Sequence, residues 1–307
     1  MKNAIVLAAG KGTRMKSDKP KVLHRICGMP MVQMIVENLK EAGTDRIVTV
    51  TGYGHEQVEE VLKGQCEFAL QEPQLGTGHA VMMAKQLENE KGKTLVVNGD
   101  AATIQKETLE SLYDALEGND MAVLCTSLED ARAYGRVIRD ENGNVEKIVE
   151  FKDATDAEKA VHEINTGIYA FDNEKLFKAL KELRNDNVQH EYYITDLVEI
   201  FRSHGWSVKG VLARDPMEVQ GCNDNAELAI SNAWLRDRIN EKLMKNGVTM
   251  VDPKTTYVGP FVTFGHDVIL HQCVSIYGHS HVGNNVEVLP GAYLMDEDVP
   301  DNTVVKK

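Results

Sequence analysis

The stretch "LAAGKGTRMKSDKPK", residues 7–21, follows a short apolar run and holds two glycines, a threonine and five basic residues in fifteen positions. A strand that runs into a glycine-rich basic loop commonly holds phosphate, because glycines let backbone N–H groups approach the phosphate oxygens. Lys11 and Arg14 add positive charge, and the guanidinium offers forked donors. The alternative is a solvated basic loop. The preceding strand and the paired glycines favour a phosphate site.

Two common phosphate-loop patterns do not fit this stretch. A P-loop needs Gly-Lys followed by Ser or Thr, but Lys11 is followed by Gly12 and the upstream glycine is missing. A dinucleotide fingerprint accepts Gly10 and Gly12 but lacks its third glycine. What remains is a Gly-x-Gly-Thr-Arg loop followed by Lys-Pro-Lys, in which Pro20 stiffens the segment that presents Lys21.

Short apolar runs alternate with longer amphipathic segments up to about residue 215. The strand-like runs are 4–8, 46–52, 66–70, 94–100, 121–128, 167–171 and 206–212. Helical patterns lie between them, as at 31–43 and 106–118. This alternation predicts an α/β fold with a Rossmann-like, mostly parallel sheet covered on both faces. Around 134–149 the rhythm breaks, and an Asn142-Gly143 turn predicts an inserted β-hairpin.

The chain is expected to divide into an α/β domain at 1–222, a connecting helix at 223–247 and a repeat domain at 248–307. Ala226, Ile230, Ala233, Trp234 and Leu243 form a loose apolar stripe along the helix.

Beyond the helix, apolar residues recur every six positions. They are Val258, Phe264, Leu270, Ile276, Val282, Val288 and Leu294. A second column of small or β-branched residues lies two positions earlier, at Thr256, Val262, Val268, Val274, Ser280, Val286 and Ala292. This period predicts a short left-handed parallel β-helix built from hexapeptide repeats.

The composition is that of a soluble globular protein, with 42% apolar and 26% charged residues. A formal charge of −13 argues against a nucleic-acid partner or an anionic membrane surface, because both need a basic face. The five cysteines are scattered and form no CxxC, so neither a disulfide framework nor a zinc site is expected. No signal peptide or membrane-spanning run is evident, and we expect a cytoplasmic protein.

Several motifs resemble those of sugar-1-phosphate nucleotidylyltransferases. They are the opening stretch extended to "KPKVLH" (19–24), "QEPQLGTGHA" (71–80), "NGD" (98–100), "YGRVIRD" (134–140), "EINTGIYAF" (163–171), "EYYITDLV" (191–198) and "VQGCNDN" (219–225). Together, over residues 3 to about 246, they resemble the uridylyltransferase half of the bifunctional GlmU family. That family makes UDP-N-acetylglucosamine, a precursor for peptidoglycan and cell wall biogenesis.

The resemblance implies which residues bind the nucleotide. The strand end and loop that line it are Leu7, Ala8, Ala9, Gly10, Lys11 and Gly12. Arg14 and Lys21 are implied as catalytic residues beside the phosphates. Gln71 is implied to read the uracil edge, with Gly76 and Thr77 completing the base pocket. A buried amide discriminates between bases because a wrong base leaves its hydrogen-bonding groups unpaired.

The resemblance also implies a metal site and a sugar site. Asp100, a catalytic residue at a strand end, is implied to bind Mg²⁺ with Asn223, and such oxygen ligands together with phosphates suit this ion. Taken alone, Asn223 also fits the N-cap of the following helix, and it can serve as both. The positions implied around the N-acetylglucosamine ring are Gly135, Glu150, Asn165 and Thr166.

The implied reaction is uridylyl transfer from UTP to N-acetyl-α-D-glucosamine-1-phosphate, with pyrophosphate as the leaving group. A sugar-phosphate oxygen attacks the α-phosphorus in line. This nucleophile is already anionic, so no general base is needed, and none is evident. Catalysis then consists of positioning and charge neutralisation. His79 is interpreted as structural.

The sequence departs from the family pattern in two places. Ala101-Ala102-Thr103 replaces the usual Pro-containing loop after the metal aspartate. The repeat domain is short, and the motifs of the second, acetyl-transferring site have no counterpart, so we expect no acetyltransferase activity. His266, His271, His279 and His281 lie in the repeats and are expected to be exposed. A homotrimer through the β-helix is possible, and whether the chain is part of a longer protein stays open.

Three other functions are left open at this point. One is a nucleotidylyltransferase that uses dTTP or another sugar-1-phosphate. Another is a catalytically inactive protein that binds nucleotide sugars or assists assembly. The inactive protein is disfavoured because a site without catalytic activity would not need to retain all four of Arg14, Lys21, Asp100 and Asn223. A bifunctional enzyme is the weakest of the three.

Overall fold

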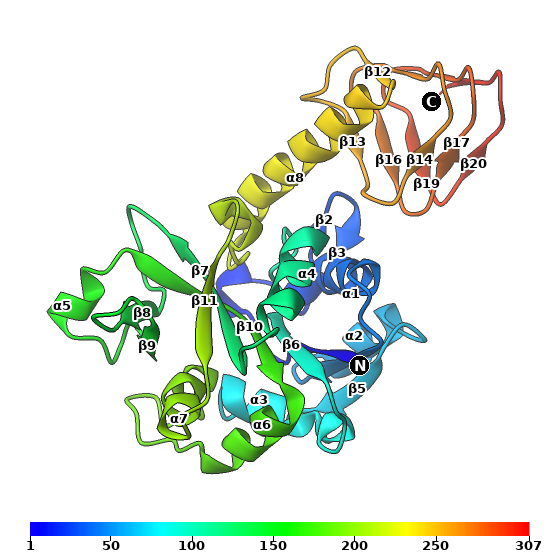
Figure 1. Ribbon diagram of the computed structural model, residues 1–307. Helices are drawn as coiled ribbons and strands as arrows, with labels where there is room; N and C mark the ends of the chain where they lie inside the picture. The colour runs from blue at the N-terminus through cyan, green and yellow to red at the C-terminus, as the bar shows by residue number, and fades with distance from the viewer. Residues whose placement is uncertain (307) are drawn as a thin grey trace. The chain divides into compact units, whose positions relative to one another are not determined.

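The computed structural model describes residues 1–306 and divides into two compact units (Figure 1). The first unit comprises Met1–Leu23 and Met31–Asn223, and the second comprises His24–Pro30 and the chain from Asp224 onward. The short segment His24–Pro30, which contains strands β2 (Arg25–Ile26) and β3 (Met29–Pro30), therefore belongs with residues two hundred positions away. Sequence patterning did not predict this assignment. Each unit is described separately below.

The first unit is built on a mixed, mostly parallel sheet, as predicted. Its main strands run in the order β11-β7-β10-β6-β1-β4-β5. They are β1 (Lys2–Ala8), β4 (Arg46–Thr51), β5 (Glu67–Leu70), β6 (Lys93–Asn98), β7 (Met121–Ser127), β10 (Glu163–Asp172) and β11 (Val208–Leu212). Only β10 runs antiparallel to its neighbours β6 and β7 on this path. Strand β1 pairs in parallel with both β4 and β6, so the loops that follow these three strands leave the sheet at the same edge.

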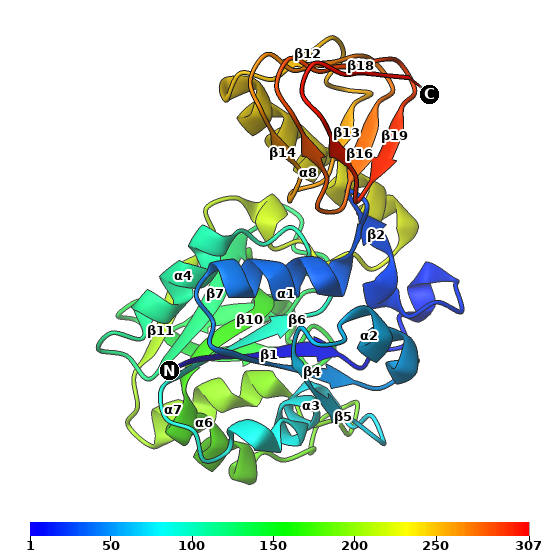
Figure 2. The same cartoon turned by 90° about the vertical axis from the view of Figure 1, so that its right-hand side faces the viewer.

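Helices cover both faces of this sheet (Figure 2). Those of the first unit are α1 (Met31–Glu41), α2 (His55–Val61), α3 (Thr77–Met83), α4 (Lys106–Ala115), α5 (Asp156–Lys159), α6 (Asn173–Ala179) and α7 (Leu197–Ser203). One apolar core packs α1, α2 and α4 against the sheet, and a second core packs α3, α6 and α7 against its other face. Alternate residues of the buried strands serve the two cores, with Val6 in one and Ile5 in the other.

The predicted hairpin is confirmed. Strands β8 (Arg136–Arg139) and β9 (Val145–Val149) pair antiparallel, and β8 also pairs with β10. Gly143 lies in the turn with a φ of 80°, a conformation that glycine adopts without a steric penalty. The turn is closed by the amide of Asp140, which donates to the carbonyl of Asn144 over 2.9 Å.

The second unit confirms the six-residue period. Its short strands are β12 (Thr249–Met250), β13 (Tyr257–Val258), β14 (Thr263–Phe264), β15 (Ile269–Leu270), β16 (Ser275–Tyr277), β17 (His281–Val282), β18 (Glu287–Val288), β19 (Tyr293–Met295), β20 (Asp298–Val299) and β21 (Val304–Val305). They stack as three parallel sheets, in which Val258 pairs with Ile276 and Ile276 with Leu294. These steps between paired residues are three hexapeptides long, and the last steps, from β17 to β20 and from β18 to β21, are one residue shorter. Both predicted columns point into one apolar core, although Phe264 is only partly buried.

The long helix α8 (Asn225–Lys245) differs from its prediction in two ways. Its N-cap is Asp224, whose carboxylate accepts from the second and third amides of the helix over 2.9 Å, so Asn223 does not cap it. The apolar stripe is only partly confirmed, because Ala226 and Ile230 are exposed, Ile230 at 52%, whereas Leu243 packs on the apolar core of the second unit. The buried side chains of the helix are instead Ser231, Leu235, Arg236 and Asn240.

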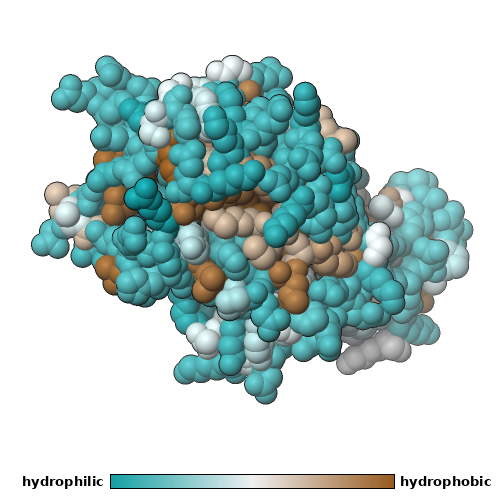
Figure 3. Space-filling model, turned by 90° about the horizontal axis from the view of Figure 1, so that it is seen from below, coloured by the Kyte–Doolittle hydropathy of each residue, from teal (hydrophilic) through white to brown (hydrophobic). Residues whose placement is uncertain are grey.

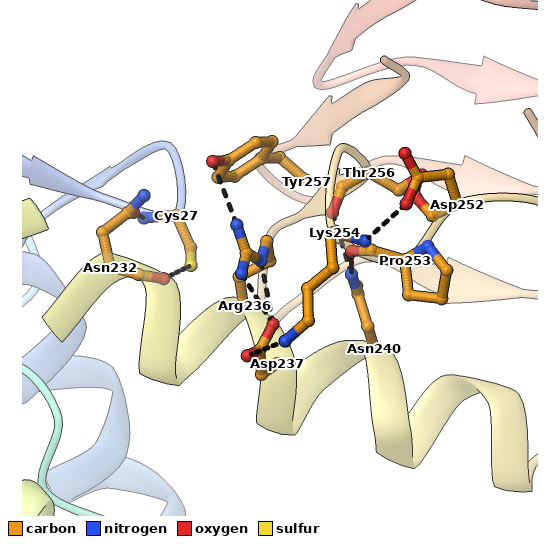
Figure 4. A network of polar contacts seen from close by, with 10 residues as sticks. All are labelled: Cys27, Asn232, Arg236, Asp237, Asn240, Asp252, Pro253, Lys254, Thr256 and Tyr257. Carbon is orange, nitrogen blue, oxygen red and sulfur yellow. Dashed lines mark hydrogen bonds and ion pairs between the residues drawn. The ribbon is translucent and has the colours of Figure 1, made fainter. Parts of the chain in front are cut away.

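Polar contacts explain why polar residues of α8 are buried (Figure 4). Asn232 accepts from the amide of Cys27 over 2.7 Å, which ties the His24–Pro30 segment to the helix. The Arg236 guanidinium donates to the Tyr257 hydroxyl over 3.2 Å and to Asp237 over 2.8 Å. Burial raises the pKa of the Cys27 thiol to about 12, so this cysteine stays protonated and unreactive.

The surface in view in Figure 3 is largely hydrophilic, with a band of apolar residues across its middle. Among residues 1–306, no helix combines the length and the apolar character that crossing a membrane requires.

We predict that Asn240→Ala destabilises the second unit by about 2 kcal/mol. The Asn240 side-chain amide donates to the carbonyls of Pro253 and Thr256, each over 2.8 Å, and its removal leaves one partly buried and one buried acceptor without this donor. Glu241→Ala, at the exposed neighbouring position, is the matched control. Denaturant unfolding followed by circular dichroism measures both variants, and equal midpoints would contradict the role of Asn240.

Candidate functional site

The basic loop after β1 is held in one conformation by short-range contacts. A short helical turn, η1 (Thr13–Met15), anchors it through the buried Met15 side chain. Gly12 has a φ of 64°, and a Cβ there would lie 2.4 Å from the Cβ of Lys21, so only glycine fits. A Cβ on Gly54 would likewise lie 2.5 Å from Pro20, which shows how closely the loop packs on the neighbouring turn. Gly10 has open space around it, consistent with a backbone left free for a ligand.

Three segments meet where β1 and β6 end. Lys21 forms an ion pair with Asp100, and both side chains are largely buried, at 18% and 13% exposure. The Lys21 ammonium also donates to the side-chain oxygen of Asn223 over 3.3 Å. Arg14 donates to the same oxygen over 2.8 Å. Arg14, Lys21, Asp100 and Asn223 therefore form one cluster, although they come from segments far apart in the sequence.

The loop after Asp100 is well ordered without the usual proline. Ala101, Ala102 and Thr103 are all buried. The Thr103 hydroxyl donates to the Glu218 carbonyl over 3.2 Å, and the Cys222 amide donates to the Asp100 carbonyl over 3.4 Å. These bonds join the segment bearing Asp100 to the segment that ends at Asn223, so the two side chains are held near each other.

The residues predicted to form the base pocket lie together at the end of β5. Gln71 is 4% exposed, and its side-chain amide nitrogen donates to the Gly76 carbonyl over 2.9 Å and to His79 Nδ1 over 3.1 Å. Burial lowers the pKa of His79, which keeps the imidazole neutral and its Nδ1 able to accept. With its nitrogen engaged inside the protein, Gln71 presents its amide oxygen as the acceptor.

The loop before α3 is shaped by close backbone contacts. Gly76 has a φ of 105°, and a Cβ there would lie 2.7 Å from the Tyr192 carbonyl. Thr77, the first residue of α3, accepts from the Ile194 amide over 3.2 Å. Residues of the "LGTGHA" and "EYYITD" motifs therefore pack on each other.

Three of the four predicted sugar residues lie together. The backbone amide of Asn165 donates to the Gly135 carbonyl over 2.9 Å. A Cβ on Gly135 would lie 3.5 Å from a carboxylate oxygen of Glu150. Burial raises the pKa of Glu150, whose carboxylate accepts from the Thr195 hydroxyl over 3.3 Å. Thr166 differs from the other three, because its buried hydroxyl donates to the Leu124 carbonyl over 2.7 Å. This bond gives Thr166 a structural role in the sheet.

Sequence reasoning missed two residues near these positions. His79 was interpreted as structural, yet it orients Gln71, and the signal was its place eight positions after that glutamine. Asp196 carries a pKa raised to about 6, first by burial and then by the charges of Glu199, Glu150 and Asp153. No sequence motif predicts this raised pKa, because the pKa depends on how the acidic side chains pack in the folded protein.

Within residues 1–306 no group of three or more His, Cys, Asp and Glu side chains is arranged to hold a metal. The repeat histidines do not gather into a site either. His266, His279 and His281 are exposed, and His271 contacts Glu287 over 2.8 Å. A cation at the Lys21 cluster would therefore have one carboxylate and one amide oxygen from the protein.

Comparison with known proteins matches this chain to nucleotide-transferring proteins. Residues 4–198 match the MobA-like NTP transferase domain. The bifunctional protein GlmU of Exiguobacterium sibiricum is 47% identical over 99% of this chain and 68% of its own length. The GlmU proteins of Lactobacillus johnsonii and Caldanaerobacter subterraneus subsp. tengcongensis are 46% and 45% identical over 99% and 96% of this chain. The chain spans about two thirds of the length of these relatives.

A solved structure shares the fold. A Bacillus anthracis protein, described as a candidate glucose-1-phosphate thymidylyltransferase and solved with sucrose, superposes with a TM-score of 0.61. The alignment covers 77% of this chain and 96% of that one, at 22% identity. At this identity the likeness speaks for the fold alone.

We predict that Asp196→Asn stabilises the protein at pH 7.5 by roughly 1 kcal/mol and has little effect at pH 4. The pKa of Asp196, about 6 in the folded state, lies above its unfolded value. Its ionisation therefore lowers stability as the pH rises through about 6, and full stability is present below about 4. Thermal melts at both pH values test this. Asp186→Asn, at an exposed position that does not contribute to the shift, is the control. A pH-independent gain for Asp196→Asn would refute the assignment.

Proposed function

This chain is a nucleotidyltransferase of the GlmU family, and on that premise we propose that it transfers a uridylyl group from UTP to N-acetyl-α-D-glucosamine-1-phosphate. The observation that carries the proposal is the cluster of Arg14, Lys21, Asp100 and Asn223 at the ends of β1 and β6. In open α/β sheets, ligands bind at the carboxyl ends of the strands where the strand order reverses, and β1 lies at such a point. The product UDP-N-acetylglucosamine would serve cell wall biogenesis.

The uracil base of UTP is proposed to hydrogen-bond to the Gln71 side chain. Its amide oxygen, left available by the inward hydrogen bonds of its nitrogen, can accept from the ring N–H of uracil. Cytosine carries no hydrogen on that ring nitrogen, so it would leave the amide unpaired. Thymine presents the same N–H as uracil. For this reason a dTTP-dependent reaction is the second candidate, with another sugar-1-phosphate as a variant of it.

Mg²⁺ fits the donor set at the cluster. The oxygens of Asp100 and Asn223 both contact the single ammonium of Lys21, so they already converge on one cation. One carboxylate and one amide suit an ion that keeps several waters and takes further oxygens from phosphate groups. When bound, Mg²⁺ would neutralise charge on the phosphates and on the departing pyrophosphate. Asp100 and Asn223 would hold it.

The chain's own residues would then align the reactants. Backbone amides of the loop at Gly10–Gly12, together with Arg14 and Lys21, bind the triphosphate and offset its charge. An oxygen of the sugar phosphate forms the new bond to the α-phosphorus while the bond to the β-phosphate oxygen breaks. Since the nucleophile is already ionised, no residue has to remove a proton, and positioning provides the catalysis.

The sugar is proposed to lie against Gly135, Glu150 and Asn165. Gly135 leaves room beside the Glu150 carboxylate, which can accept from a sugar hydroxyl or amide. Asn165 already donates to the Tyr169 hydroxyl over 2.7 Å, and its oxygen accepts from Gly167. The Asn165 side chain is therefore held rigidly in place.

Further parts of the proposal concern the second unit and the setting. Its parallel coil is proposed to be a left-handed β-helix, through which three copies could assemble, and the protein is proposed to work in the cytoplasm. Absence of acetyltransferase activity stays a prediction, as does the inactive-protein alternative.

The test is pyrophosphate release with Mg²⁺, a panel of nucleoside triphosphates and a panel of sugar-1-phosphates. We expect the highest kcat/KM with UTP and N-acetylglucosamine-1-phosphate. Faster turnover with dTTP or with glucose-1-phosphate would establish the second candidate instead, and no turnover with any pair would support an inactive protein. Acetyl-CoA with glucosamine-1-phosphate is the control for acetyl transfer.

We predict that His79→Ala raises the KM for UTP by about tenfold and changes kcat little, because Gln71 loses the acceptor that orients its amide. His79→Asn restores an acceptor and should recover part of the affinity. Discrimination against CTP should also fall in the alanine variant. An unchanged KM in His79→Ala would show that His79 only fills space.

A further inference from the structure

Lys21 contacts both of the oxygens that are proposed to bind the metal. Its ammonium pairs with Asp100 Oδ2 and donates to Asn223 Oδ1 over 3.3 Å. Asn223 Oδ1 also accepts from Arg14 over 2.8 Å. Each oxygen that would coordinate a divalent cation is therefore already satisfied by a cationic side chain of the protein.

A divalent cation and this ammonium would compete for the same two oxygens. Mg²⁺ lies about 2.0–2.1 Å from an oxygen that coordinates it. An ammonium nitrogen lies about 2.7–2.9 Å from an oxygen that accepts its hydrogen bond. On the same oxygens, the two cations would therefore lie within a few ångströms of each other. Repulsion at that distance is strong in a site whose side chains are mostly shielded from water, as Lys21 and Asp100 are. This repulsion would favour the displacement of Lys21 from Asp100 when a cation enters.

The surroundings of Lys21 determine how it can move. Its Cβ packs against Gly12, at a position where a side chain on residue 12 would collide with it, so the base of the lysine is held by the basic loop. Only the outer part of the side chain is then free to swing. The same loop presents Gly10 and Arg14, which are proposed to receive the phosphates. A triphosphate bound there would offer new partners to both Lys21 and Arg14.

We propose that the Lys21 ammonium is a displaceable occupant of the cation site, which competes with the divalent cation for Asp100 and Asn223 until nucleotide phosphates draw it away. The cation then binds weakly to the protein alone and much more tightly together with the nucleotide. This inference rests on the metal assignment in the proposed function. It adds a second role for Lys21, namely coupling the binding of the two ligands.

The chain offers a matched control for charge. Lys11 belongs to the same loop, but its ammonium lies over the ring of Tyr53, 5.2 Å from the ring centroid, and not on Asp100. Lys11→Met and Lys21→Met remove the same charge from the same loop. Only the second variant removes the ammonium from the two oxygens, although Arg14 still donates to Asn223. A general effect of charge on cation affinity would appear in both variants, whereas competition for the oxygens would appear only in Lys21→Met.

The experiment is titration of the full chain with Mn²⁺, followed by the electron paramagnetic resonance signal of the free ion, in the absence of nucleotide. We expect Lys21→Met to bind Mn²⁺ at least tenfold more tightly than the unaltered protein, and Lys11→Met to stay within about threefold. Lys21→Gln, which keeps a donor for Asp100 without the charge, should change in the same direction. Adding a non-hydrolysable UTP analogue should then tighten Mn²⁺ binding much less in Lys21→Met than in the unaltered protein. Thermal melts confirm that each variant is folded.

Unchanged or weaker Mn²⁺ binding in both Lys21 variants would overturn the inference, and so would an equal gain in Lys11→Met. Asp100→Asn separates this failure from failure of the metal assignment. If Mn²⁺ binding depends on Asp100 but not on Lys21, the competition is wrong and the metal site stands. If binding is indifferent to Asp100 in either Lys21 background, the metal assignment itself fails, and the competition fails with it. The pyrophosphate assay tests the transfer reaction independently of both.

Discussion

The parallel pairing of β1 with β4 on one side and β6 on the other is the constraint from which the candidate site follows. Parallel strands end at the same edge of a sheet, so the loops after them meet there whatever their sequences. The loop after β1 brings the cations, and the loop after β6 brings Asp100. The end of β5, next to β4, brings Gln71. Burial of these strands on both faces by two separate cores keeps the edge rigid.

The charges of the clustered side chains determine which ligands that edge of the sheet can bind. A protein of net charge −13 gathers Arg14 and Lys21 beside a single carboxylate, so the cluster is locally positive in an acidic molecule. Each member has a partner within the cluster, which explains how Lys21 and Asp100 can be largely buried, whereas Arg14 stays exposed. The partners are also the groups that a nucleotide and a metal would need. Binding of a nucleotide and a metal would therefore exchange one set of contacts between charged groups for another. It would not leave a buried charge without a partner.

Periodic features were predictable from the sequence. Alternating apolar runs indicated the sheet strands, the Asn142-Gly143 turn indicated the hairpin, and the six-residue columns indicated the parallel coil. Each depends on a local repeat, which is a property of neighbouring residues. The stripe expected along α8 was only partly right, because Arg236 and Asn240 hold that helix by hydrogen bonds in addition to the apolar contacts of Leu243. The place of the His24–Pro30 segment was also unpredictable, because its partners lie two hundred residues away.

By itself, the sequence determined the strands. It also predicted a phosphate-binding loop and, through resemblance, the residues expected at the site. Only the tertiary structure decided how those residues meet. Lys21 reaches Asp100 across 79 positions and Asn223 across 202, and Thr166 proved to be bonded to the sheet. Such contacts depend on the order of strands and on the packing of side chains, which no local pattern encodes. A motif can therefore identify Lys21 as a candidate site residue, but it cannot show which oxygen atoms the Lys21 ammonium contacts.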